Sequence, residues 1–235
     1  MAIGVVLVVA LGIGVVCATT GGPSERDAVQ RFAHAWDRGD WAAMRRETTS
    51  DVQSHYPARS FARRYAAAEQ TATETSVRTG KPKDDGNGNW RLPVVVQTSA
   101  FGPVRGDVAL KVVKDGDVAA IAWTPSLVFP GLAGRETLTR TTEMPARGDL
   151  LARDGTPLAQ GPNRTSPLGP AAQAIVGALG PIPADHQAQD AELGYPEGTQ
   201  VGISGLERAF DERLAGTPGG ELRACLLYTS DAADE

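Results

Sequence analysis

Residues 24–41 read SERDAVQRFAHAWDRGDW and decide the fold of the first half of the chain. Ser24 and Asp27 have the spacing of a capping box, in which a side-chain acceptor is followed three residues later by an acid. Gly39 is predicted to stop the helix, and Asp40 to cap a second one. Between these signals the apolar side chains recur at helical spacing and predict one buried face; they are Ala28, Val29, Phe32, Ala33 and Trp36.

The pattern after this segment changes from helical to extended. Ser60 is predicted to open a third helix. Side chains then alternate along two strands, with turns at 85–89 and 115–116 and a further strand at 118–123; the inward positions are Trp90, Leu92, Val94, Val96, Val108, Leu110 and Val112. Helices followed by antiparallel strands predict an α+β domain over 24–128, with three helices on one curved sheet.

Composition excludes several classes of function. The chain has 235 residues, a formal net charge of −5, and 23 Lys and Arg that form no basic block. A nucleic-acid partner is therefore not expected. The two cysteines, Cys17 and Cys225, and the three dispersed histidines lack the spacing of a disulfide framework or a zinc site. We expect neither a metal nor a cofactor.

A connector and a hairpin follow the first domain. Residues 123–132 read WTPSLVFPGL, and the two prolines predict a stiff, extended connector. Residues 147–159 read RGDLLARDGTPLA, which predicts a strand, a turn at Asp154 and Gly155, and a returning strand. Leu150 and Leu158 are expected to face one core across this hairpin.

A third block, residues 202–216, reads GISGLERAFDERLAG. Ser204 and Glu207 again have capping-box spacing, and Gly216 is predicted to end the helix. Apolar side chains recur every four residues between these signals and predict one amphipathic helix; they are Leu206, Phe210 and Leu214.

In this order the blocks resemble class B penicillin-binding proteins of the methicillin-resistance type. Residues 33–41 and the later strands resemble a nuclear transport factor 2-like (NTF2-like) fold, and 123–132 resembles the family's Trp-x-Pro-Ser-Leu-x-Phe-Pro-x-Leu. The hairpin is similar to Arg-Gly-x-Ile-x-Asp-Arg-x-Gly-x-x-Leu-Ala. The third block is similar to the family's Ser-Gly-Leu-Glu helix, with Phe210 where tyrosine is usual.

The resemblance implies a partial, β-rich dimerisation or pedestal domain over 129–224. Its motif residues are expected to be structural; they are Arg147, Gly148, Arg153, Gly155, Leu158, Ala159, Gly202, Ser204, Gly205, Leu206 and Glu207. Ala152 stands where the family has aspartate. This exchange removes an acceptor for a neighbouring arginine, so we expect the local network to be altered.

The motifs of the transpeptidase reaction are missing from this sequence. A serine-type D,D-transpeptidase needs Ser-x-x-Lys, Ser-x-Asn and Lys-Thr/Ser-Gly. No serine here has lysine three positions later, no Ser-x-Asn occurs, and none of the lysines is followed by Thr-Gly or Ser-Gly. We therefore predict no catalytic residue and an inactive chain, although the resemblance implies that the parent protein is such an enzyme.

The cone-shaped cavity of NTF2-like folds raises a rival hypothesis. Asp40, His55 or Tyr65 could serve as an acid or base in such a pocket. The structural interpretation makes Asp40 a helix cap, His55 a loop residue and Tyr65 part of the core. We favour the structural interpretation, because no two of these residues have a spacing that fixes them together.

Both ends of the chain carry unusual segments. Residues 2–16 read AIGVVLVVALGIGVV and are uncharged; since a bilayer span takes about 20 residues, 1–22 is predicted to be an uncleaved signal anchor. Lipidation of Cys17 is the alternative. Residues 225–235, CLLYTSDAADE, resemble a translated sequencing adapter, so we predict that they are an artefact.

The leading hypothesis is a single-pass protein of the bacterial cell membrane whose bulk is extracytoplasmic. The first domain acts as a spacer and the second as a pedestal for a missing transpeptidase domain. Peptidoglycan and β-lactams are expected to bind only through that missing domain, and other cell-wall synthesis proteins are expected partners. The alternatives are a self-standing NTF2-like enzyme or ligand binder, and a lipoprotein scaffold.

Overall fold

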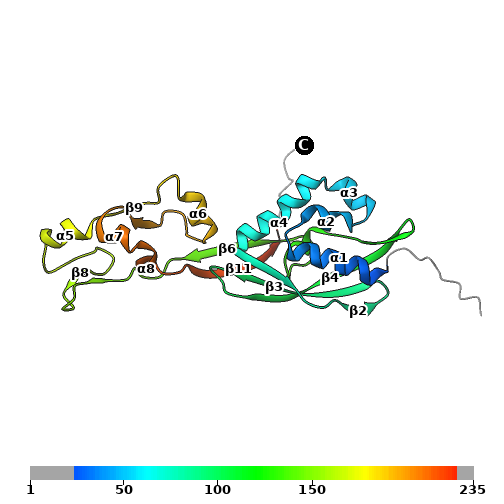
Figure 1. Ribbon diagram of the computed structural model, residues 1–235, viewed down its shortest axis with the longest axis horizontal. Coiled ribbons are helices and arrows are strands. Elements are labelled where there is room, and N and C mark those ends of the chain that lie inside the picture. The colour runs from blue at the N-terminus through cyan, green and yellow to red at the C-terminus, as the bar shows by residue number, and fades with distance from the viewer. Residues whose placement is uncertain (1–23, 227–235) are drawn as a thin grey trace, which may run out of the picture.

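The computed structural model describes residues 24–226 of the chain. Figure 1 shows an elongated molecule with helices α1–α4 over a sheet at one end, a smaller module at the other, and strands β6 and β11 between them. In the part described, no helix has the length and apolar character needed to cross a bilayer. The predicted anchor at 1–22, Cys17 and nearly all of the predicted adapter lie outside the described residues.

Four helices cover the sheet of the first domain, where three were predicted. They are α1 (Glu25–Asp37), α2 (Trp41–Arg46), α3 (Ser50–His55) and α4 (Ala58–Ala72). The capping box at Ser24 is present, and the Asp40 side chain accepts from the Ala43 N–H at 2.8 Å. All five apolar residues predicted on α1 are buried. The start of the first domain is therefore confirmed residue by residue.

One helix was predicted after α2, with its start misplaced, and the structure has two there. Helix α3 was not predicted; it begins after Thr49, whose hydroxyl accepts from the Val52 N–H at 3.3 Å. Ser60 does not open a helix, because α4 already begins at Ala58, behind Pro57. Proline has the fixed φ of a helix entry, so it marks the start that the Ser60 signal misplaced.

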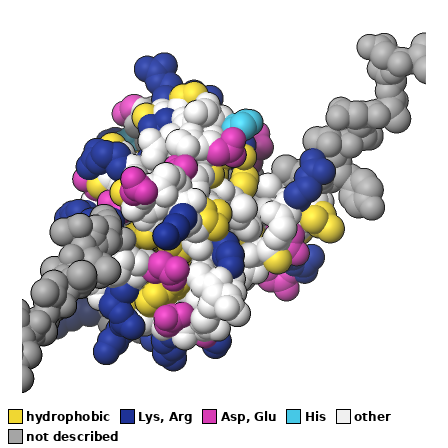
Figure 2. Space-filling view, turned by 90° about the vertical axis from the view of Figure 1, so that its right-hand side faces the viewer, with side chains coloured by type: hydrophobic (Ala, Val, Ile, Leu, Met, Phe, Trp, Pro, Cys, Tyr) yellow, Lys and Arg dark blue, Asp and Glu magenta, His cyan; other side chains and the backbone are white. Residues whose placement is uncertain are grey.

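The antiparallel sheet has five strands in the order β1-β3-β4-β5, with β2 also paired to β3. The strands are β1 (Glu74–Thr79), β2 (Lys83–Gly86), β3 (Asn89–Thr98), β4 (Val104–Asp115) and β5 (Val118–Ile121). The inward positions predicted on β3 and β4 are all buried. The fold is thus α+β, with helices packed on a curled sheet, as expected. Figure 2 views the end of this domain far from the second module, and basic and acidic side chains are interspersed on it.

An aromatic cluster fills the space between α4 and the sheet. The Tyr65 ring stacks on Trp41 with centroids 4.7 Å apart, and the Phe61 ring lies 4.8 Å from Trp123. The Trp123 Nε1–H donates to the Tyr65 hydroxyl at 2.9 Å, and both residues are buried. The interior of the first domain is therefore packed around a satisfied polar pair.

Replacing Tyr65 by phenylalanine is expected to lower the free energy of unfolding of this domain by about 1–3 kcal/mol. The indole N–H of Trp123 would stay buried without an acceptor, and the cost is its lost hydration. Urea unfolding followed by tryptophan fluorescence measures the change. Tyr56→Phe is the matched control, since Tyr56 is only half-buried and meets Trp123 through its ring edge. Equal effects of the two substitutions would contradict this account of the hydrogen bond.

The connector after β5 was predicted to be extended, but part of it is helical. Residues Pro125–Val128 form the 3-10 helix η1, and Leu127 and Phe129 are buried in the first core. Proline's φ near −65° also suits the first turn of a 3-10 helix, so Pro125 starts a turn here. The segment therefore packs as part of the first domain.

A two-stranded antiparallel ribbon connects the second module to the first domain. Strand β6 (Glu136–Glu143) pairs with β11 (Gly219–Leu226) from Glu136 opposite Leu226 to Glu143 opposite Gly219. Leu138 and Leu222 of this ribbon pack against the first core. The chain between β6 and β11 forms the second module, whose elements are β7 (Leu150–Leu151), β8 (Pro157–Ala159), α5 (Pro170–Val176), β9 (Leu179–Pro181), α6 (Gln187–Glu192), β10 (Gln200–Gly202), α7 (Gly205–Ala209) and α8 (Asp211–Ala215).

The single helix predicted over 204–216 is two short helices, α7 and α8. The break falls at Phe210, whose φ of −118° and ψ of 17° are not helical. Leu206 and Leu214 reach the second core, but Phe210 is 41% exposed, so its predicted inward position was wrong. The end of the block at Gly216 is confirmed, with φ +71°.

Candidate functional site

Four charged side chains from distant parts of the sequence meet inside the second module. Arg147 lies just before β7, Arg164 lies in the loop after β8, Glu207 is on α7, and Asp211 begins α8. The Glu207 side chain is 1% exposed, and those of Arg147 and Arg164 are 12% and 11% exposed. A buried carboxylate is stable only when it is paired, so this cluster is a defined feature of the fold.

Each oxygen of Glu207 is held by a different arginine. Arg147 Nε donates to Glu207 Oε2 at 2.8 Å, and Arg164 Nε donates to Oε1 at 2.7 Å. Arg164 Nη2 also lies 2.6 Å from Oε1, so the two groups form an ion pair, but the angle between them is not that of a hydrogen bond. Because both oxygens accept from arginines and the side chain is 1% exposed, this carboxylate has a structural role.

The remaining bonds tie the cluster to the backbone. Arg147 Nη2 donates to Asp211 Oδ1 at 2.6 Å, and the same oxygen accepts from the Gly202 N–H at 2.6 Å. Arg164 Nη1 donates to the Gly148 carbonyl at 3.0 Å. The cluster therefore cross-links the hairpin, strand β10 and helices α7 and α8 into one unit.

The capping box predicted at Ser204 and Glu207 was wrong. The Ser204 hydroxyl accepts from the Ala178 N–H at 2.9 Å, and the Glu207 side chain turns inward to the arginines. Helix α7 has no side-chain cap. Ion pairs with two buried guanidinium groups stabilise a carboxylate more than a hydrogen bond from one backbone N–H does.

The hairpin motif contributes unequally to the cluster. Arg147 belongs to the charged cluster, while Arg153 is exposed to solvent. The network expected to change at Ala152 is built from Glu207 and Asp211 instead, and the Ala152 N–H donates to the Thr156 carbonyl within the hairpin at 2.8 Å. Arg147 is thus paired without an acid at position 152.

The other predicted motif residues lie around the cluster as structural parts. The Gly148 N–H donates to the Leu214 carbonyl at 2.8 Å, and Gly155 forms the hairpin turn with φ +85°. Ala159 is fully buried, with Leu158 packed beside it as predicted. Leu206 completes the same core.

Two of the predicted glycines are needed for close backbone approach. A Cβ at Gly202 would lie 2.1 Å from the Glu207 carbonyl oxygen. Gly205 has φ +58°, and a Cβ there would lie 2.6 Å from the Ile175 carbonyl oxygen. These glycines let β10, α5 and α7 pack backbone to backbone around the charged cluster.

Sequence reasoning missed Arg164 and Asp211. Glu207 sits between apolar positions of the third block, and a buried acid requires a counter-charge; that requirement was the available signal. The partner itself could not be identified, because Arg164 is 43 residues away and adopts a left-handed φ of +50°.

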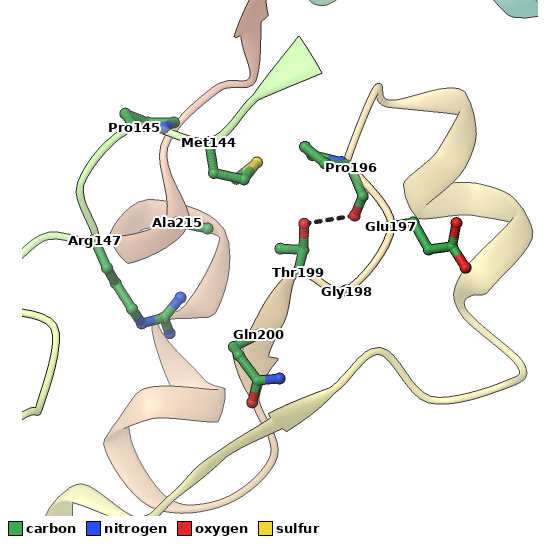
Figure 3. Close-up of a pocket in the computed structure, with 9 residues that line it drawn as sticks. All are labelled: Met144, Pro145, Arg147, Pro196, Glu197, Gly198, Thr199, Gln200 and Ala215. Atoms are coloured by element: carbon green, nitrogen blue, oxygen red, sulfur yellow. Dashed lines mark hydrogen bonds between the residues drawn. The ribbon is translucent and has the colours of Figure 1, made fainter. Parts of the chain in front are cut away.

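A groove of about 300 Å³ lies beside Arg147. Figure 3 shows Met144 and Pro145 on one side and the loop 196–199 on the other, where the Thr199 hydroxyl donates to the Pro196 carbonyl at 2.7 Å. The lining holds no serine, cysteine or histidine. The one hydroxyl group in the lining, that of Thr199, is bonded to the backbone.

The acid and base candidates of the first domain contact different partners. Asp40 caps α2, and burial raises the pKa of the Tyr65 hydroxyl far above its ordinary value, so it stays protonated. His55 is exposed at the end of α3, with Nδ1 3.3 Å from the Asp51 carboxylate. Within residues 24–226, no group of three or more His, Cys, Asp and Glu is placed to hold a metal ion.

Comparison with known proteins gives the two halves separate matches. Residues 24–136 match the family described as NTF2-like N-terminal transpeptidase domain, and residues 159–224 match the penicillin-binding protein dimerisation domain. The chain is also similar to Penicillin-binding protein 3 of Bacillus subtilis (strain 168), with 26% identity over 168 residues. That similarity covers 66% of this chain and 25% of the relative, so the chain spans about a quarter of the curated protein it matches.

The two domains follow one another in the order that the sequence blocks predict, and the second one contains the buried cluster. The chain belongs to the penicillin-binding proteins that carry an NTF2-like N-terminal domain and a dimerisation domain.

Proposed function

We propose that this chain is the non-catalytic, extracytoplasmic front part of a serine-type D,D-transpeptidase that cross-links peptidoglycan. Residues 24–128 act as a spacer, and 129–224 act as the pedestal on which the catalytic domain stands. Residues 1–22 anchor the protein in the bacterial cell membrane, and 225–235 are foreign to the native sequence. The single observation that carries this proposal is the ordered pair of domains in a sequence without the three transpeptidase motifs.

The contacts of the second module support a pedestal role. A support must hold one shape, and the charged cluster joins segments that are up to 64 residues apart. Charged hydrogen bonds with fixed geometry restrict such a module to one arrangement.

A ligand-binding or catalytic role for the first domain has less support. Phe61, Tyr65 and Trp123 occupy the interior in which the rival hypothesis places a substrate. The only hydroxyl among them is bonded to the Trp123 indole. The lipoprotein alternative depends on Cys17, and mass analysis of the membrane form for a diacylglycerol thioether tests it directly.

Labelling with a fluorescent penicillin tests the proposal. The 235-residue chain is expected to stay unlabelled, because a penicillin acylates a serine that a nearby lysine activates, and the sequence has no Ser-x-x-Lys. The matched positive sample is the product of the complete gene, read past the codon for Ala224. That product is expected to contain all three motifs and to be labelled. Covalent labelling of the short chain, or a complete gene without those motifs, would refute the proposal.

A further inference from the structure

The two modules touch at a second place besides the ribbon. Arg140, on β6, donates from Nη1 to the Gln70 carbonyl at 2.8 Å and from Nη2 to the Ala191 carbonyl at 3.0 Å. Gln70 is in the last turn of α4 and Ala191 is in the last turn of α6. Each carbonyl also accepts a backbone N–H, from Thr73 and Gly194 respectively, and a carbonyl oxygen can accept two hydrogen bonds. One guanidinium therefore bridges the two helix ends and holds α6 against α4.

The segment after α6 fits closely against the first domain. Gly194 has φ +91°, and a Cβ there would lie 3.1 Å from Ala100 Cβ and 3.2 Å from Thr73 Cγ2. The Ser99 hydroxyl lies within 3.5 Å of the Leu193 carbonyl. The contact is therefore tight enough to be lost if α6 moves by a small amount.

Acidic side chains gather at the same junction. Glu69 on α4, Glu74 on β1 and Glu192 on α6 line one cavity of about 430 Å³. The lining of this cavity contains no basic side chain. Other charged residues on the packed elements are Arg59, Arg63 and Arg64 on α4, Arg78 on β1, Asp190 on α6, and Glu136, Arg140 and Glu143 on β6, while the segment 99–102 carries none. Arg140 is bonded to carbonyl oxygens, so the carboxylates around the cavity repel one another when they are ionised.

We propose that this junction is a pH-sensitive hinge in which Arg140 holds the second module against the first domain, and Glu69 and Glu74 loosen that contact as they ionise. The hinge sets the angle between the two modules and does not depend on the proposed function of the chain.

The direction of the effect follows from the burial of Glu74. Burial, with the nearby charge of Glu69, raises the pKa of Glu74 from its ordinary 4.5 to about 7. Burial also raises the pKa of Glu69. The closed junction thus binds protons more tightly than an open one. Closure is fully favoured below pH 4.5 and weakens as the pH rises through about 7, and the open-to-closed ratio rises by up to about tenfold per pH unit.

Energy transfer between two dyes tests the hinge in the full chain, held in detergent solution. Cysteines replace the exposed residues Arg59 on α4 and Asp185 before α6, in a background with Cys17→Ser and Cys225→Ser. Transfer efficiency is expected to fall as the pH is raised from 5 to about 7 and to change little from there to 9, because the pKa of Glu74 is about 7 in the closed junction. Glu74→Gln is expected to stay closed, and Arg140→Ala open, over the whole range.

Glu143→Gln is the matched control, since Glu143 is an exposed acid on the same strand as Arg140. It should follow the curve of the parent chain. A flat curve for the parent, an unchanged curve for Glu74→Gln, or a flattened curve for Glu143→Gln would each overturn the proposal. Tryptophan fluorescence shows that the first domain of each variant is folded, since all four tryptophans lie in that domain, and hydrogen exchange of β10, α7 and α8 shows the same for the second module.

Discussion

Glu207→Ala should lower the free energy of unfolding of the second module by about 3–5 kcal/mol, the usual cost of removing one partner from a buried ion pair. The carboxylate is the common partner of Arg147 and Arg164, whose side chains are nearly buried. Its removal leaves two guanidinium groups with one remaining acid, Asp211, which pairs with Arg147 and not with Arg164. The nearly buried guanidinium groups of Arg147 and Arg164 then lose the negative charge that they share.

Hydrogen exchange can assign this loss to the second module. Amides of β10, α7 and α8 should exchange at least about 100-fold faster in Glu207→Ala, because each 1.4 kcal/mol is a factor of ten in the opening equilibrium. The tryptophan fluorescence transition should not move, since the tryptophans report only on the first domain. Glu212→Ala is the control, because Glu212 is an exposed acid on neighbouring α8. If both variants exchange alike, the cluster does not stabilise the module.

Phe61→Ala is expected to destabilise the first domain by about 3–5 kcal/mol, through lost burial and the cavity left behind. Phe61 is 0% exposed and lies between the rings of Tyr65 and Trp123, with centroids 5.2 Å and 4.8 Å away. Those rings are held by a mutual hydrogen bond, so they cannot easily collapse into the space. Urea unfolding followed by tryptophan fluorescence measures the change.

Phe210→Ala provides the comparison, because it deletes the same ring from a residue that is 41% exposed. This change should cost less than about 1 kcal/mol, since little buried area is lost. Hydrogen exchange of α7 and α8 measures it, because the tryptophans report only on the first domain. A Phe61 variant no less stable than the Phe210 variant would mean that the aromatic cluster is not the core of the first domain.

Local signals in the sequence predicted much of the first domain. The Ser24 capping box, the apolar face of α1 and the alternation along β3 each depend on residues close in sequence, and all are present. Helix α3 escaped notice because it has six residues and one buried side chain, Val52, too few to establish a period. Strand β1 was missed for a similar reason, since none of its side chains is fully buried.

The candidate site was predicted only as a set of residues, without its chemistry. The motif residues Arg147 and Glu207 were named from the family resemblance, but their mutual bond spans 60 residues and no local pattern reports it. Helical spacing from Leu206 to Leu214 predicted one helix and placed Phe210 inside. The pairing of Asp211 with Arg147 and Gly202 instead coincides with a break in the helix there. Long-range charge pairing prevailed over local periodicity.

The pairing of β6 with β11 has a mechanical consequence. Glu136, which receives the chain from the first domain, is paired with Leu226 at the near end of the ribbon. A pulling force between the first domain and whatever follows Leu226 would enter and leave the ribbon at that same end. Its rungs would then open one after another, like a zipper, while residues 144–218 stayed off the path of the force.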